Sequence, residues 1–242
     1  MLARERRVLR RLEAHCHFLA PRVLYEDPAG WDLRCAVRGA VGWPGMYERI
    51  RGDSIFAHRF GQEIGRMLAE QHTRIPLAQI QGSLPPPWPL AQDLAPLSRV
   101  IQDASLLSRI DVALRRRAAL PEEQPVLLHG DLGPHNIVVD PQSLLPRGLI
   151  DYEGAALGDR HRDFAYLVFQ QREEAMLEGA LAVYEPATGA KIDRGRVLLL
   201  NAVAAIGFLA FRHGHPPEEA WCGRTLKQDL AWTHAALGLV GL

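Results

Sequence analysis

The apolar residues in the first part of this chain recur at helical spacing in two segments. Residues 2–18 place apolar side chains among arginines at this spacing, which predicts an amphipathic helix that Pro21 ends. Its apolar positions are Leu2, Val8, Leu9 and Leu12. Residues 54–72 predict a longer helix, because several apolar residues fall on one common side of it. These residues are Ile55, Phe56, Phe60, Ile64, Met67 and Leu68.

Shorter apolar runs bounded by turn-forming residues predict strands. Residues 23–25 and 33–37 fit two edge strands, and the Gly- and Pro-rich stretch that follows predicts a hinge at residues 39–45. Residues 137–139 and 148–150 fit two more strands, since a turn-prone sequence lies between them. This second pair therefore predicts a β-hairpin.

The second half of the chain is dominated by helical patterns. Residues 90–120 predict one or two helices. Three or four more are expected after Phe164, with breaks near residues 186–189 and 214–217. The longest apolar run, Val197–Phe211, is shorter than a bilayer span and contains an asparagine, so we expect a buried helix there.

Composition narrows the class of partner. The 242 residues are 48% hydrophobic, which is ordinary for a packed core. Twenty-eight basic residues balance 28 acidic ones, so no global field attracts nucleic acid or an anionic membrane, and small-molecule chemistry fits best. Cys16, Cys35 and Cys222 form no C-x-x-C pair, which argues against a disulfide framework or a structural zinc site. The charged N-terminus is unlike a signal peptide, and we expect a cytoplasmic protein.

Residues 129–163 carry the most informative polar pattern, because two aspartates and an asparagine surround the predicted hairpin. Phosphoryl transfer needs a carboxylate that accepts the proton of the incoming hydroxyl, and Asp131 is the candidate base. Magnesium prefers oxygen ligands, and Asn136 and Asp151 at the two ends of the hairpin supply them. Protein kinases show the same spacing between the catalytic Asp and the metal-binding Asn. The sequence therefore predicts magnesium-dependent phosphoryl transfer.

The surrounding motifs make the resemblance to a family specific. The motif residues are His129-Gly130-Asp131, Asn136, Ile150-Asp151, and Gly158-Asp159 with Asp163. They resemble the aminoglycoside phosphotransferase and choline kinase family, whose members share a protein-kinase-like fold. The similarity covers most of residues 5–185 and is strongest in this core. It implies an α+β fold with a mostly helical C-terminal lobe, a catalytic β-hairpin and a reduced N-terminal lobe.

The resemblance also implies roles for individual residues. Asp131 is the implied catalytic base, and Asn136 and Asp151 are the implied ligands of Mg²⁺ and, through it, of ATP or another nucleoside triphosphate. His129 is the second residue implied for the catalytic loop, where it braces the loop more than it shuttles a proton. Asp163 is implied to brace the same loop.

Asp159 and Glu5 are expected to give structural support, and His135 is expected to be a surface bystander. The three central residues could instead be turn and cap residues, since Asp and Asn favour such positions; the agreement of the surrounding spacings favours the functional interpretation.

The chain departs from the family at its N-terminus. Relatives carry a nucleotide-covering sheet with a lysine that pairs with a helix glutamate, whose counterpart here is Glu5. Both lysines of this chain, Lys191 and Lys227, follow the catalytic segment, and no G-x-G-x-x-G or P-loop motif occurs. Glu5 is then expected to pair with a neighbouring arginine. The arginines that could replace the lysine are Arg4, Arg6, Arg7, Arg34 and Arg38. A reading frame that begins upstream of Met1 is the other explanation, and the sequence leaves both open.

Three functions from different classes follow. The first is an ATP-dependent kinase of a small hydroxylated molecule. The second is a pseudokinase or binding protein that has lost its nucleotide lid. The third is a metal-dependent hydrolase, suggested only by the sequence Gly158-Asp159-Arg160-His161. We rank them in this order, because the missing lysine slows phosphoryl transfer without removing its base.

The expected organisation has two parts. Residues 1–45 form a remnant N-terminal lobe and hinge, and residues 46–242 form the helical C-terminal lobe with the catalytic loop and the metal-binding hairpin. A reduced sheet would leave an unpaired edge, so a homodimer that covers it is a further expectation. Neither a nucleic-acid nor a membrane partner is expected.

Overall fold

The computed structural model describes residues 2–41, 46–80, 82, 84–85, 97–168, 174–212, 215–216, 219–220 and 224–242. These residues divide into two compact units, one formed by Met1–Trp88 with Glu123–Ile192 and one formed by Pro89–Glu122 with Asp193–Leu242. The predicted boundary at residues 45 and 46 stays a prediction, because residues 42–45 of the expected hinge lie outside the described residues.

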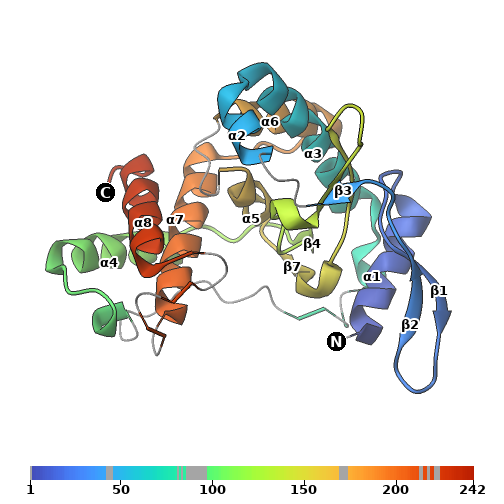
Figure 1. Ribbon diagram of the computed structural model, residues 1–242, viewed down its shortest axis with the longest axis horizontal. Helices are drawn as coiled ribbons and strands as arrows, with labels where there is room; N and C mark the ends of the chain where they lie inside the picture. Colours follow the sequence, from blue (N-terminus) through green and yellow to red (C-terminus); the bar gives the residue numbers. More distant parts are fainter. Residues whose placement is uncertain are drawn as a thin grey trace. The chain divides into compact units, whose positions relative to one another are not determined.

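The first unit contains helices from the N-terminal part and from the middle of the chain (Figure 1). They are α1 (Leu2–His15), α2 (Met46–Gly52), α3 (Ser54–Arg74), α5 (His161–Ala165) and α6 (Glu174–Thr188). The predicted helix at residues 2–18 is therefore α1 and the predicted helix at 54–72 is α3, while α2 was not predicted. Helix α6 ends just before Gly189, at the predicted break.

Helices α3 and α6 pack against each other at very short range. Asp53 caps the start of α3, since its side chain accepts a hydrogen bond of 2.9 Å from the Phe56 backbone N–H. Gly61 allows the close approach, because a Cβ at this position would collide with the carbonyl oxygen of Met176 in α6. The prediction for Ile55 is wrong: its side chain is 74% exposed, because it shares the solvent side of α3 with Arg59 and Arg66.

Three small sheets belong to the same unit. Strand β1 (Arg22–Glu26) pairs antiparallel with β2 (Asp32–Cys35), close to the two predicted edge strands. The predicted hairpin is formed by β5 (Ile137–Val139) and β6 (Pro146–Leu149), with β3 (Ala40–Val41) on the other side of β5. A third sheet pairs β4 (Val126–Leu128) with β7 (Ala156–Gly158). Strands β3, β4 and β7 were not predicted.

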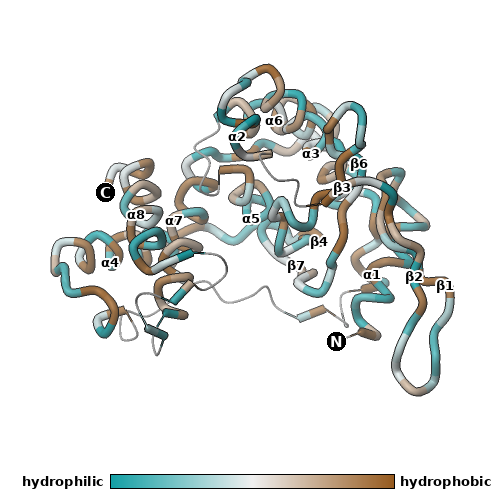
Figure 2. The backbone as a smooth tube through the Cα atoms, viewed as in Figure 1, coloured by the Kyte–Doolittle hydropathy of each residue, from teal (hydrophilic) through white to brown (hydrophobic). Residues whose placement is uncertain are grey.

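The second unit is built from helices. They are α4 (Ala104–Ala118), α7 (Arg194–Phe211) and α8 (Leu226–Leu239). Helix α7 is long and apolar enough to cross a membrane by length and composition, although such helices also form protein cores, and 56% of the tested window is buried. The tube of α7 is accordingly mostly on the hydrophobic side of the scale in Figure 2. This agrees with the buried helix predicted at Val197–Phe211.

Candidate active site

The predicted catalytic loop connects two buried strands. Strand β4 ends at Leu128, the loop begins at His129, and the 3₁₀ turn at Pro134–Asn136 leads directly into β5. This path brings Asp131 and Asn136 into contact. The Asn136 amide nitrogen donates to the backbone oxygen of Asp131 at 2.8 Å and to its Oδ2 at 3.1 Å.

Asp131 has the environment of an ionised and accessible carboxylate. Its Oδ2 also lies 3.1 Å from Nε2 of His135, and its side chain is 46% exposed. The hydrogen bond from His135 is the largest influence on the pKa of Asp131. Together with the electrostatic effect of the nearby histidines and the hydrogen bond from Asn136 it outweighs burial, so this pKa is lowered. Both donors use Oδ2, and Oδ1 has no hydrogen-bond partner among the described residues. Oδ1 is therefore the atom that can accept a proton from a substrate.

Asp151 follows the second strand of the hairpin. The Ile150 N–H donates to the carbonyl oxygen of Asn136 at 3.0 Å, so Asp151 is one residue beyond the point where the two chain segments pair. Its backbone is left-handed, with φ 62° and ψ 71°, and its Oδ1 accepts a long hydrogen bond of 3.4 Å from the Glu153 N–H. A left-handed conformation is uncommon for a residue other than glycine, and such positions are concentrated at functional sites.

The side-chain oxygens of Asn136 and Asp151 suit a hard divalent cation. The Asn136 side chain uses its nitrogen toward Asp131, and its oxygen has no hydrogen-bond partner among the described residues. No basic side chain pairs with the Asp151 carboxylate in the described part of the chain. One amide oxygen and one carboxylate are enough protein ligands for Mg²⁺, which keeps waters and also binds phosphates.

His129 braces the loop from inside. Its side chain is fully buried, its Nε2 lies 3.0 Å from the carbonyl oxygen of Ile150, and its Nδ1 lies 3.3 Å from the Asp131 N–H. This pattern assigns the proton to Nε2, since Nδ1 accepts from a backbone N–H. Burial lowers the pKa of His129 and keeps the ring neutral. The ring thereby ties Asp131 to Ile150, the residue before Asp151.

Asp163 anchors the start of the same loop. Its Oδ2 accepts from the His129 N–H at 2.9 Å, and its Oδ1 accepts from the Gly130 N–H at 3.1 Å. Nε2 of His72 lies 3.2 Å from Oδ2, and the Tyr184 hydroxyl lies 2.9 Å from the other nitrogen of this ring. Burial alone would raise the pKa of Asp163, but the hydrogen bond and charge of His72 and the loop N–H groups lower it.

Two further contacts fix the loop backbone. Gly130 has φ 83°, and a Cβ there would collide with the carbonyl oxygen of Gly154, so the turn requires glycine. The Tyr166 hydroxyl donates to the Gly130 carbonyl oxygen at 2.7 Å. The loop is therefore held from α5 and its 3₁₀ extension as well as from the hairpin.

A buried chain of hydrogen bonds links α3 to β4 and to the segment that follows the hairpin. The Tyr152 hydroxyl donates to the side-chain oxygen of Gln71 at 2.9 Å, and the side-chain nitrogen of Gln71 donates to the Leu127 carbonyl oxygen at 2.9 Å. The Tyr152 ring also packs on His129, with 4.5 Å between ring centroids. The residue that follows Asp151 is thus part of the core.

The structure places Asp159 and Glu5 in different surroundings. Oδ1 of Asp159 accepts from the His161 N–H at 3.0 Å and lies 2.6 Å from Nδ1 of the same histidine, at the start of α5. Glu5, in the first turn of α1, pairs with Arg34 at 2.9 Å. The prediction that Glu5 pairs with an arginine is confirmed, and its contribution to the catalytic loop stays a prediction.

Several residues of the site were missed in the sequence. His135 is 64% exposed as expected, but it is bonded to Asp131 and is no bystander. Its position four residues after Asp131 and directly before Asn136 was the feature of the sequence that could have indicated this contact. For Gln71 and His72 the available signal was the sequence Leu68-Ala69-Glu70-Gln71-His72, which resembles a helix end of the same family but does not indicate their partners. Tyr166 gave no local signal, because its partner lies far away in the sequence.

A kinase-like helical fold whose β5–β6 hairpin is flanked by Asp131, Asn136 and Asp151 defines the class of protein-kinase-like phosphotransferases. Comparison with known proteins gives the family. The model of the phosphotransferase enzyme family matches residues 2–200, and the chain belongs to this family.

Individual relatives agree with this assignment. Streptomycin 3''-kinase of Streptomyces griseus is 39% identical over 75 residues, which cover 31% of this chain and 28% of that kinase. The GDP complex of aminoglycoside 2'-phosphotransferase-IIIa aligns with a TM-score of 0.67 at 18% identity, over 98% of this chain and 79% of the other. A macrolide 2'-phosphotransferase from Brachybacterium faecium aligns with a TM-score of 0.65 at 19% identity, over 98% and 79%. The two solved structures show the same fold.

Proposed function

We propose that this protein transfers the γ-phosphoryl group of ATP or another nucleoside triphosphate to a hydroxyl of a small molecule. The observation that carries the proposal is the contact between Asp131 and Asn136 beside the segment that bears Asp151. Membership of the phosphotransferase family supports the reaction class. The solved neighbours include complexes with GDP and with ATP, so both nucleotides are candidates.

The geometry supports a role for each of these residues. Asp131 accepts the proton of the attacking hydroxyl through Oδ1, while His135 and Asn136 hold Oδ2 and fix the direction of the carboxylate. Asn136 and Asp151 would hold Mg²⁺, which supplies charge stabilisation for the phosphates. His129 and Asp163 keep the loop in place, since they bind its backbone.

Only the relatives indicate which class of substrate to expect. Neighbours and the curated relative act on or bind streptomycin, kanamycin and macrolides, which are hydroxylated small molecules. We therefore infer an acceptor of this kind, and a cytoplasmic protein without a nucleic-acid or membrane partner.

Turnover with a panel of acceptors tests the proposal. ATP and GTP consumption is measured with Mg²⁺ and streptomycin, kanamycin, a macrolide or choline, for the wild type and Asp131→Asn. Asp111→Asn on α4 is the matched control, because it makes the same chemical change at a surface ion pair. We expect at least one acceptor to be phosphorylated and Asp131→Asn to lose about a hundredfold or more in rate, within the range for a positioned base. If calorimetry detects no binding of either nucleotide, the pseudokinase alternative takes precedence.

The β1–β2 hairpin supports the proposed homodimer. Four large apolar side chains are about half exposed there: Leu24, Tyr25, Trp31 and Leu33. Two strands alone also leave unpaired edges, which favour pairing with another chain. Light scattering should give a dimer mass that Leu33→Glu reduces to a monomer mass, and a monomeric wild type would refute the proposal.

A further inference from the structure

Gly133 and His135 lie on either side of Pro134 in the catalytic loop, and the glycine makes room for the histidine ring. The backbone of Gly133 is extended, with φ −77° and ψ 162°, which any residue can adopt. A Cβ at this position would lie 2.7 Å from Nδ1 of His135 and closer still to its Cε1, and the three nearest heavy atoms all belong to this ring. Residue 133 is therefore small because the ring of His135 fills the space above it.

The opposite side of the same ring faces the base. Nε2 of His135 lies 3.1 Å from Oδ2 of Asp131, and the carboxylate can only accept, so Nε2 carries the proton. The backbone under the ring is a closed turn, since the Asn136 N–H donates to the Gly133 carbonyl oxygen at 2.9 Å. The His135 side chain is 64% exposed, so the contact with Gly133 and the hydrogen bond to Asp131 fix its orientation more than packing does.

The direction of the Asp131 carboxylate depends on its donors. The terminal torsion of an aspartate is broad, so one donor restricts its rotation less than two donors do. Oδ2 meets Nε2 of His135 and the amide nitrogen of Asn136, each at 3.1 Å. The charge of Asp131 does not require His135, because the ordinary pKa of an aspartate, 3.8, already lies far below neutral pH. What the histidine adds is therefore direction.

We propose that Gly133 and His135 form one positioning unit, in which the ring seated over Gly133 holds the Asp131 carboxylate so that Oδ1 faces the attacking hydroxyl. The inference rests on the proposed function and deepens it. It assigns an influence on the chemical step to Gly133, which has no side chain to touch a reactant. Because both residues act through Asp131, their loss should lower kcat and leave substrate binding unchanged.

Steady-state kinetics on the full chain test the role of His135. The probes are MgATP with the first acceptor that is phosphorylated, in the order streptomycin, kanamycin, a macrolide and choline. His135→Ala should lower kcat about tenfold to a hundredfold, the range for a misplaced reacting group, and should change both KM values by less than about twofold. His135→Gln should recover most of this loss, because its amide nitrogen can reach the place of Nε2, whereas His135→Asn is too short and should not. His17→Ala is the matched control, because His17 is also an exposed histidine beside a carboxylate, 3.6 Å from Glu70, and it should change neither kcat nor KM.

Gly133→Ala tests whether the two residues act together. The extended backbone accepts alanine, so the variant should fold as the wild type does in thermal unfolding, while its Cβ displaces the ring. We expect kcat to fall toward the value of His135→Ala, and we expect no further fall when Gly133→Ala is added to His135→Ala. Gly52→Ala is the matched control, since a Cβ there meets no atom within 4 Å among the described residues.

Nuclear magnetic resonance of ¹⁵N-labelled histidine tests the same pair without turnover. The His135 signals are those that His135→Ala removes, and both Asp131→Asn and Gly133→Ala should shift the Nε2 signal. Unchanged signals would overturn the pair. Wild-type kcat in His135→Ala, a loss confined to KM, or losses in Gly133→Ala and His135→Ala that multiply independently would overturn its role and leave the proposed function standing. A wild type that phosphorylates no acceptor would overturn the proposed function and, with it, the role in turnover, and the resonance shifts would then decide the contact alone.

Discussion

Asp163 offers the sharpest test of how the catalytic loop is held, and the perturbation is Asp163→Asn. The carboxylate is fully buried and accepts three hydrogen bonds, from the N–H groups of His129 and Gly130 and from the His72 ring. An asparagine has the same shape but only one acceptor oxygen. Whichever way its amide is turned, an NH₂ group faces a backbone N–H of the loop.

The cost can be worked out from these contacts. If the asparagine oxygen takes the place of Oδ2, the bonds from His129 and His72 survive in weaker, uncharged form, and the Gly130 N–H loses its acceptor. A buried donor without a partner costs about 1 to 3 kcal/mol, and the lost charge assistance adds about 1 kcal/mol. We therefore expect the free energy of unfolding to fall by about 2 to 4 kcal/mol, a large share of a typical stability.

Chemical denaturation followed by circular dichroism measures this change at neutral pH. The Asp111→Asn variant is the control, since its ion pair with Arg115 is partly exposed and worth little. A loss below about 0.5 kcal/mol for Asp163→Asn would refute the reasoning, because such a value is typical of surface substitutions.

The pH dependence of stability follows from the same contacts. The pKa of Asp163 is lower in the folded chain than its usual value of 3.8, so its stabilising contribution is present above that value and is lost as pH falls through the folded pKa. The lowered pKa of His129 acts in the same direction, because the unfolded chain binds its proton first once pH falls below 6.5. Stability should decline from neutral pH toward acid, and Asp163→Asn should remove the part of the decline below about pH 4.

Three further substitutions have graded expected effects. Gly130→Ala should unfold the loop region and abolish turnover, since the residue has φ 83° and its new Cβ meets Gly154; near-normal thermal stability would contradict this. Tyr152→Phe should cost about 1 to 3 kcal/mol in denaturation experiments, because the buried oxygen of Gln71 loses its donor. Lys191→Ala should change the free energy of unfolding by less than about 0.5 kcal/mol, since its ion pair is exposed. A larger loss in the same assay would contradict the expectation that exposed ion pairs add little stability.

Local features were predictable from the sequence, because their determinants lie within a few residues of each other. The β5–β6 hairpin follows from two apolar runs around the Asp140 turn, and α3 follows from helical spacing with Asp53 as its cap. The contact between Asp131 and Asn136 was implied by their spacing, since a single 3₁₀ turn closes it. Short patterns of apolar and turn-forming residues are therefore enough to predict these local features.

The supporting contacts could not be predicted, because they join distant segments. His72 and Asp163 are 91 positions apart, and Gln71 and Tyr152 are 81 positions apart. Nothing in the local pattern says that α3 supplies both contacts. The placement of Ile55 on the common apolar side of α3 was wrong for a different reason: helical spacing puts it on the side of Arg59 and Arg66, which faces solvent.

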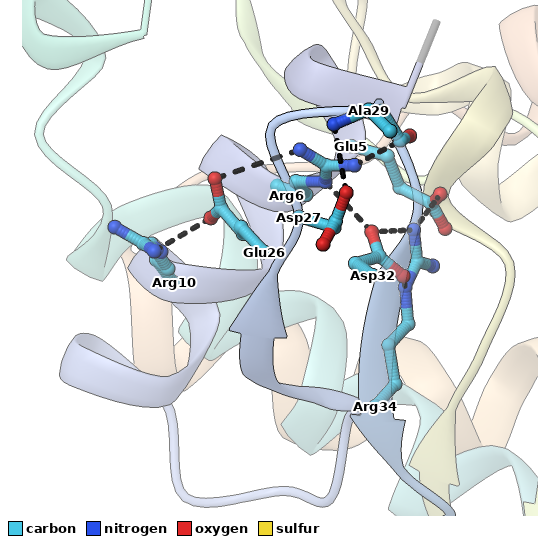
Figure 3. Close-up of polar contacts among 9 residues, drawn as sticks. Glu5, Arg6, Arg10, Glu26, Asp27, Ala29, Asp32 and Arg34 are labelled. Atoms are coloured by element: carbon cyan, nitrogen blue, oxygen red, sulfur yellow. Dashed lines mark hydrogen bonds and ion pairs between the residues drawn. The ribbon is translucent and has the colours of Figure 1, made fainter.

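Two carboxylates near the N-terminus, Glu5 and Asp32, show how burial constrains the residues around them (Figure 3). Glu5 and Asp32 have side chains only 10% and 7% exposed, and buried carboxylates need a positive partner to avoid a large desolvation cost. Arginine suits the place between Glu5 and Asp32 better than lysine, because its planar guanidinium can donate to both carboxylates at once. Arg34 pairs with Glu5 at 2.9 Å and with Asp32 at 2.8 Å, so one guanidinium meets this requirement for both carboxylates.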